Sequence, residues 1–158
     1  MKKIRIPLLI ISILIPLFLG GVAGVLNVEG MRGFGMLVQP KLTPAPWVFI
    51  VVWTILYILM GIACYFVLSE DCLWQAKAKA LKVYVLQLFF NFLWPFIFFG
   101  QDAFVFALYW LFALLGITIL NVVLFFGVKR VSGWLMLPYV LWLLAAIYLN
   151  WRIIVLNL

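Results

Sequence analysis

The sequence contains no histidine and few acidic residues, and these two absences narrow the chemistry open to the protein. Without histidine, imidazole general bases, histidine-type zinc sites and histidine-ligated haem are excluded. Ion-coupled pumps need ionisable groups inside the membrane. The acidic residues all lie outside the long apolar segments: Glu29, Glu70, Asp71 and Asp102. Acid–base enzymes and ion-driven transporters are therefore both disfavoured, and no catalytic residue is assigned.

Cysteine and charge are also scarce. Cys64 and Cys72 form neither a metal-binding spacing nor a disulfide framework, so no metal site and no cofactor is expected. Charged residues make up 9% of the 158 residues and hydrophobic ones 70%. A soluble domain of this length would need far more polar surface. The solvent in which this chain folds is therefore mostly lipid.

Long apolar segments fill almost the whole chain. About 20 consecutive apolar residues cross the hydrocarbon core as a helix, and only helices or closed barrels satisfy their backbone groups in lipid. A barrel would need alternating polarity, which these segments lack. We therefore predict an all-α membrane protein, a single domain over residues 1–158 formed by one bundle of five transmembrane helices. The expected helices are 6–26, 46–68, 81–99, 103–128 and 134–154.

The first apolar segment has a second interpretation. Lys2, Lys3 and Arg5 precede it, and small residues end it, as in a secretory signal peptide. Against that interpretation, the apolar stretch continues to Leu26, which is longer than a usual signal core. Removing it would also leave four helices.

The basic residues divide unequally between the two ends of the expected bundle. Eight lie in the amino-terminal tail and in the second and fourth connections, and three lie on the opposite side: Arg32, Lys41 and Arg152. For a protein of the plasma membrane of a prokaryote, which is the expected location, the positive-inside rule then predicts a cytoplasmic amino terminus and an external carboxyl terminus. An organellar outer membrane is the alternative, and there the orientation could differ. The net charge of +7 needs no nucleic-acid partner, because anchoring to lipid headgroups accounts for it.

The connection over residues 27–45 is the only long one. Long connections in compact folds tend to be lids or binding elements, although a plain solvated connector is the alternative. Thr43, Asp102 and Ser132 are expected to cap the second, fourth and fifth helices. The turn at 100–102 makes the third and fourth helices antiparallel neighbours. Prolines are expected inside three helices, at Pro16, Pro95 and Pro138.

Three of the expected helices carry a similar stripe of aromatic, amide or hydroxyl, and small side chains. Spacings of three and four residues place each stripe on one helical face. Ordinary bundle packing is one explanation. Taken together, the stripes favour a cavity for a planar apolar ligand, because tryptophan and tyrosine offer flat faces plus one hydrogen-bond donor. The stripes are Phe49, Trp53, Tyr57 and Gly61; Tyr84, Gln87, Asn91 and Trp94; and Tyr139, Trp142, Ala146 and Asn150.

These residues resemble the TspO/MBR family of tryptophan-rich sensory proteins, which includes the translocator proteins of animals. The resemblance covers nearly the whole chain. It implies a five-helix bundle, often dimeric, that binds porphyrins, sterols and isoquinoline-type drugs in a pocket covered by the first loop. The motifs that carry it are Pro40, Thr43, Pro44 and 47–49 leading into 53–57 and 60–61; Gln87, Asn91, Trp94 and 98–100; and 138–139, Trp142, Ala146 and 149–150.

The chain departs from the family pattern mainly in the first loop. Gly33 and Phe34 stand where the family commonly has Trp-Tyr, Gln39 replaces a lysine, and Leu42 replaces a tryptophan. The third-helix proline, Pro95, comes one position early. These changes remove ring faces and a cation from the lid.

The leading hypothesis is an integral membrane receptor or carrier-like protein for a porphyrin or another tetrapyrrole. The alternatives are a light-dependent porphyrin-degrading enzyme and a membrane stress or structural protein without a ligand. The expected partners are the ligand, the lipid bilayer and a second copy of the chain in a homodimer. The expected ligand-binding residues are Trp47, Phe49, Trp53, Tyr57, Gln87, Asn91, Trp94, Tyr139, Trp142 and Ala146, with Phe34, Leu37, Pro40 and Leu42 in the lid.

Overall fold

The computed structural model describes residues 4–158, and this part of the chain is helical with five helices long and apolar enough to cross a membrane. The predicted all-α bundle is confirmed. Lys2 and Lys3, which carry part of the expected amino-terminal charge, lie outside the described residues. The helices are α1 (Ile6–Leu26), α2 (Val28–Phe34), α3 (Pro46–Ser69), α4 (Trp74–Phe98), α5 (Phe104–Val128) and α6 (Arg130–Asn157).

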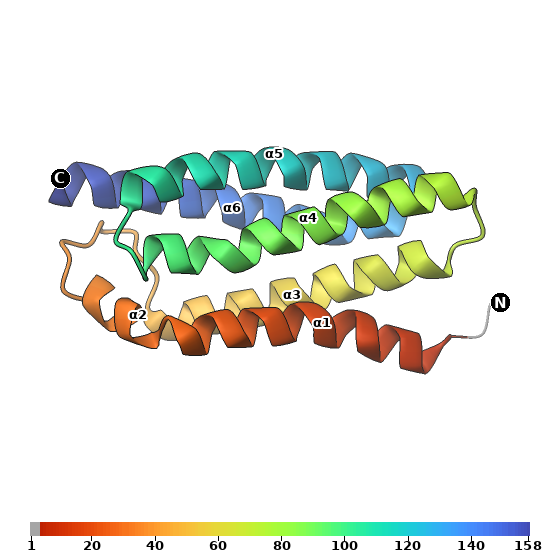
Figure 1. Ribbon diagram of the computed structural model, residues 1–158, viewed down its shortest axis with the longest axis horizontal. Coiled ribbons are helices and arrows are strands. Elements are labelled where there is room, and N and C mark those ends of the chain that lie inside the picture. The colour runs from red at the N-terminus through yellow and green to blue at the C-terminus, as the bar shows by residue number, and fades with distance from the viewer. Residues whose placement is uncertain (1–3) are drawn as a thin grey trace.

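The long helices lie roughly parallel to one another, with α1 beside α3 and α5 beside α6 (Figure 1). Helix α4 packs on α5, as the short turn between them predicted. The connections α3–α4 and α5–α6 lie at the same end of the bundle as the start of α1, and α2 lies at the other end with the carboxyl terminus. The chain therefore has a basic end, where the cation-rich connections gather, and a lid end.

Several element boundaries differ from the prediction. Helix α4 begins at Trp74 and not near residue 81, because the alternating lysines and alanines before Leu81 are good helix formers despite their charge. Helix α6 begins at Arg130 and ends at Asn157. The segment 27–45, expected to be a loop, contains the short helix α2. Helix α2 is only seven residues long and is polar, so a pattern of apolar segments does not predict it.

All three expected helix caps are wrong. Ala45 precedes α3, Ala103 precedes α5, and neither helix has a side-chain cap. Ser132 lies within α6. In the turn between α4 and α5, Asp102 adopts a left-handed conformation with φ of 50°. The expected prolines inside helices are confirmed at Pro16, Pro95 and Pro138.

Helix α1 packs closely against α3 through glycine. A Cβ atom at Gly61 would lie 2.5 Å from the Cα atom of Ile13, so only glycine permits this approach. A Cβ atom at Gly20 would collide with the Tyr57 ring, whereas Gly24 has open space around it. This close contact supports the interpretation of α1 as a member of the bundle.

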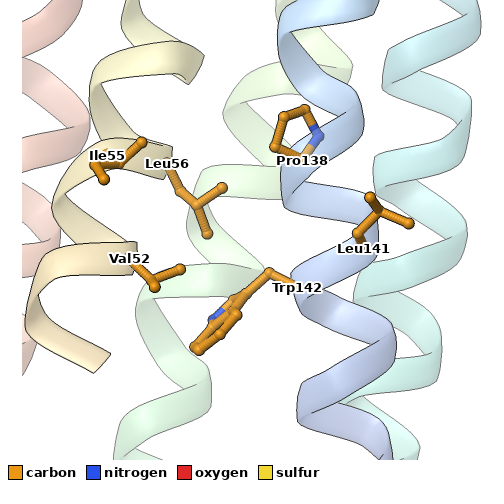
Figure 2. A pocket seen from close by; sticks show the side chains of 6 residues that line it. All are labelled: Val52, Ile55, Leu56, Pro138, Leu141 and Trp142. Carbon is orange, nitrogen blue, oxygen red and sulfur yellow. The ribbon is translucent and has the colours of Figure 1, made fainter. Parts of the chain in front are cut away.

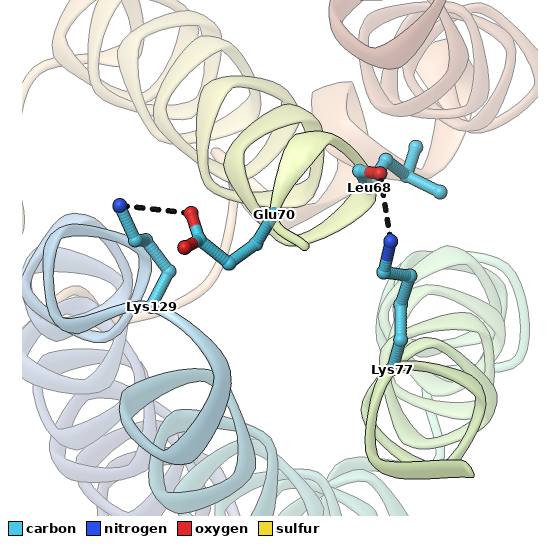
Figure 3. Close-up of polar contacts among 4 residues, drawn as sticks. All are labelled: Leu68, Glu70, Lys77 and Lys129. Atoms are coloured by element: carbon cyan, nitrogen blue, oxygen red, sulfur yellow. Dashed lines mark hydrogen bonds and ion pairs between the residues drawn. The ribbon is translucent and has the colours of Figure 1, made fainter. Parts of the chain in front are cut away.

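Polar contacts join neighbouring connections at the basic end (Figure 3). The Lys129 Nζ atom lies 2.8 Å from Glu70 Oε2, which ties the α5–α6 junction to the end of α3. The ammonium group of Lys77 donates to the Leu68 carbonyl oxygen at 3.1 Å. Both contacts are partly exposed, so they position the connections more than they stabilise the fold. The direction in which this end faces across the membrane stays a prediction.

Candidate functional site

A buried hydrogen-bonded trio joins three helices at the centre of the bundle. The Tyr57 hydroxyl of α3 donates to Asn91 Oδ1 of α4 at 2.8 Å, and Asn91 Nδ2 donates to the Tyr139 hydroxyl oxygen of α6 at 2.6 Å. The proline one turn later, Pro95, cannot bond back to the Asn91 carbonyl, so α4 carries extra polarity at this level. A polar group left alone in an apolar interior is costly. The trio therefore fixes α3, α4 and α6 against one another at this depth.

Aromatic rings pack against this trio on the side that faces the lid end. Trp53 stacks on Tyr57 with 5.3 Å between ring centroids and an interplanar angle of 29°. It also meets Trp142 edge to face at 6.4 Å, and Phe49 meets the same indole edge to face at 5.7 Å. The stripes of α3, α4 and α6 thus converge, as their spacing predicted.

The space between these rings is nearly closed. A cavity of only about 10 Å³ lies among Trp53, Asn91, Trp94 and Ala146, with three leucines completing its wall. That is about enough room for one water molecule. The stripes predict an open cavity, and this structure does not have one at that place. Trp53 stacks on Tyr57, so the rings themselves fill the space. Any ligand larger than water must move them apart.

Two polar side chains at this level make no hydrogen bond of good geometry within the described residues. The Trp94 Nε1 atom is buried and makes no hydrogen bond, although its ring lines the small cavity. Gln87 is fully buried one turn below Asn91, close to the Tyr139 hydroxyl, and neither amide atom makes a well-formed hydrogen bond. Unpaired buried donors and acceptors are rare in native proteins, and each calls for a partner such as a water molecule or a ligand. The site therefore offers donors that a ligand could satisfy.

The lid closes the same end of the bundle through aromatic contacts. The Phe34 ring lies 5.5 Å from both Phe98 and Phe99, and Phe98 stacks on Trp94 with centroids 5.0 Å apart. Leu37 packs into the same cluster. A continuous series of rings thus leads from the lid to the small cavity.

A second lid contact comes from the last turn of α6. The Asn157 amide pairs with the backbone of Val38, which donates to Oδ1 at 2.9 Å and accepts from Nδ2 at 3.1 Å. Gln39 donates from its side-chain amide to the Phe34 carbonyl oxygen at 2.6 Å. The middle of the lid, residues 34–38, is therefore held by ring contacts with the end of α4 and by a paired amide from α6.

Not every expected site residue joins this cluster. Trp47 is 67% exposed at the first turn of α3, and Leu42 is 71% exposed in the lid, so both face away from the packed rings. Pro40 is buried within the lid. Asn150 lies against the first turn of α5, where one orientation of its amide bonds to Phe104 and Leu108. Whether each expected residue contacts a ligand stays a prediction.

Sequence reasoning missed part of the site. Leu111 and Leu114 of α5 and Leu143 of α6 line the small cavity, but a leucine in an apolar helix carries no distinguishing signal. Thr118 lies close to the Tyr139 hydroxyl and bonds to its own helix. The sequence did not predict the role of Asn157 either, because that role depends on a contact with Val38, which lies 119 positions away in the chain.

A larger groove lies outside the ring cluster, between α3 and α6. Its volume is about 380 Å³, and its lining is apolar apart from one indole N–H. Figure 2 shows Trp142 reaching from α6 toward α3, with Val52 and Leu56 on the facing helix. Within residues 4–158 there is no cluster of His, Cys, Asp and Glu that could hold a metal ion. The site is thus aromatic, uncharged and without metal ligands.

Comparison with known proteins identifies one family throughout. The model of the TspO/MBR family matches residues 12–156. The chain is similar to the tryptophan-rich protein TspO of Archaeoglobus fulgidus, with 34% identity over 150 residues, 94% of this chain and 96% of the relative. It is also similar to the human translocator protein, with 35% identity over 128 residues, 78% and 76% of the two chains. A tryptophan-rich sensory protein of Cereibacter sphaeroides is 34% identical over 119 residues, 75% and 73% of the two chains.

Proposed function

The chain belongs to the TspO/MBR family, and we propose that it is a receptor or carrier-like membrane protein that binds a planar apolar ligand of the porphyrin class. The single observation that carries the proposal is the convergence of Trp53, Trp94 and Trp142 from three helices around the Asn91 trio. Indole faces stack on a flat conjugated ring, and the free Trp94 N–H can donate to a polar substituent.

Binding in this site requires the rings to separate. Ligand pockets commonly hold roughly 300–1,000 Å³, far above the 10 Å³ between the rings. The stacking of Trp53 on Tyr57 and of Phe98 on Trp94 must therefore be replaced by stacking on the ligand. Because tryptophans are displaced, binding should change the intrinsic fluorescence strongly.

The test is a fluorescence titration of the protein in nanodiscs with protoporphyrin IX. We expect saturable quenching, and a Trp53→Ala, Trp142→Ala double variant should bind about tenfold more weakly or worse, since each aromatic pair contributes about 0.5–1.5 kcal/mol. The matched control is Trp74→Ala, Trp134→Ala, which removes two indoles that are 71% and 64% exposed at the basic end. Equal weakening by both double variants would overturn the site.

The closed interior favours one competing hypothesis, a structural membrane protein without a small ligand. Absence of saturable quenching in the unsubstituted protein would support that hypothesis and overturn ours. Illuminating the complex and following the porphyrin absorption bands separates binding from degradation, because a protein that only binds the pigment returns it unchanged, apart from bleaching seen without protein.

A further inference from the structure

The groove between α3 and α6 opens toward lipid at mid-membrane depth. Ile55 and Leu141, which line it, are 51% and 67% exposed, so its outer rim is not covered by another helix. Its lining residues lie near the middle of two membrane-spanning helices. The surface that faces this groove in a bilayer is therefore the hydrocarbon region, not the aqueous phase.

Two indole rings in contact separate this groove from the closed cavity, Trp142 on the groove side and Trp53 on the cavity side. On α6, Leu141 and Trp142 line the groove, whereas Leu143 and Ala146 line the cavity. On α3, Trp53 lines the cavity and meets Trp142 edge to face. Movement of the Trp142 ring, together with the unstacking of Trp53 from Tyr57 that binding already requires, would join the two spaces.

We propose that this groove is a lateral entrance through which a planar apolar ligand passes from the bilayer into the site, and that Trp142 is the gate. The proposal rests on the proposed function and adds the route and the gating residue. A porphyrin-class ligand partitions into lipid, so it reaches the groove without crossing water. The occupant of the groove is the ligand in transit.

Two features of α6 allow the gate to move. Both ring contacts of Trp142 are edge to face, and no described residue accepts a hydrogen bond from its indole. Pro138 lies one turn before it in the groove wall (Figure 2) and cannot donate to the Trp134 carbonyl oxygen. Helices bend most readily at such a missing bond. A small bend here would shift Trp142 relative to α3 without breaking another backbone hydrogen bond of α6.

The lid end gives no comparable path. There the rings of Phe34, Phe98 and Trp94 stand between the lid and the cavity, and the Asn157 amide holds the lid backbone. Entry from that side would have to separate several packed rings and two hydrogen bonds. Entry from the groove displaces two rings, Trp142 and Trp53, and breaks no hydrogen bond of either indole.

The experiment measures entry and exit rates in proteoliposomes. Vesicles preloaded with protoporphyrin IX are mixed with protein in acceptor vesicles, and the porphyrin's own fluorescence reports binding; the reverse mixing reports release. Leu141→Trp places a large ring in the groove mouth without touching the cavity. The matched control is Leu120→Trp, a 48% exposed position at the same distance from the lid end on α5, outside the groove.

We expect Leu141→Trp to slow association and dissociation by the same factor of about tenfold, which corresponds to about 1.4 kcal/mol of added barrier. The dissociation constant should stay within about twofold, because the site itself is unchanged. Leu120→Trp should alter neither rate. Unchanged rates in Leu141→Trp, with saturable binding intact, would overturn the entrance while leaving the proposed function standing. Failure of the unsubstituted protein to bind would overturn both.

Oligomeric state is measured on the same samples by chemical cross-linking. A dimer that Leu141→Trp converts to monomer, with rates unchanged, would assign the groove to a second copy of the chain and overturn the entrance.

Discussion

Replacing Asn91 by leucine should destabilise the bundle through its central trio. The side chain is 4% exposed, accepts from Tyr57 at 2.8 Å and donates to Tyr139 at 2.6 Å. Leucine has a similar volume and removes both hydrogen bonds. Side-chain hydrogen bonds between membrane helices average about 0.6 kcal/mol and reach about 1.7. The two bonds together therefore predict a loss of about 1.2–3.4 kcal/mol in the free energy of unfolding.

Part of this loss comes from the hydroxyl group left behind. After Asn91→Leu, the buried Tyr57 hydroxyl has lost its acceptor, and an unpaired buried group costs about 1–3 kcal/mol, whereas the Tyr139 hydroxyl keeps Gln87 and Thr118 close by. Changing Tyr57 to phenylalanine in the same variant removes the unpaired group. The double variant should therefore be more stable than Asn91→Leu alone, by at least about 1 kcal/mol.

The assay is equilibrium unfolding in mixed detergent micelles, followed by far-ultraviolet circular dichroism. Asn121→Leu is the matched control, because Asn121 is also fully buried but makes one longer bond, 3.3 Å to the Ala80 carbonyl oxygen, and leaves its Oδ1 unpaired. Its loss should be less than half as large. An Asn91→Leu variant within about 0.3 kcal/mol of the unsubstituted protein, or a double variant less stable than the single, would refute the reasoning.

Three further predictions concern a free donor, the lid and helix packing. Trp94→Phe, which removes the unpaired N–H together with part of a packed ring, should weaken protoporphyrin IX binding by about two- to tenfold, the contribution of one hydrogen bond; unaltered affinity would contradict this. Asn157→Ala should speed amide hydrogen exchange at Val38 by about two- to tenfold, and unchanged exchange would show that the amide does not hold the lid. Gly61→Ala should cost about 1–3 kcal/mol, whereas Gly24→Ala, with open space around it, should cost nothing, as thermal unfolding in detergent can check.

The sequence predicted the bundle well because lipid imposes one rule on every spanning segment. Any apolar stretch of sufficient length must form a helix there, whatever its neighbours are. The residues of the site were also visible, since Tyr57, Asn91 and Tyr139 interrupt apolar helices at helical spacing. Buried polar side chains in lipid are costly, so their positions carry information.

The caps and the lid were poorly predicted for the opposite reason. At the ends of the helices water can satisfy the backbone, so Thr43 and Asp102 are not required to cap. Helix α2 has no apolar period, and its place depends on the rings of Phe98 and Phe99 at the end of α4.

The sequence by itself therefore determined how many helices cross the membrane and which of their faces carry the aromatic and amide groups. Only the tertiary structure decided that those groups meet as a closed stack, that Asn157 holds the lid, and that the open groove lies outside Trp142. The physical reason is the distance along the chain over which each interaction acts. Burial in lipid acts on each segment separately, whereas ring stacking, the paired amide and the space between two helices depend on residues far apart in the chain.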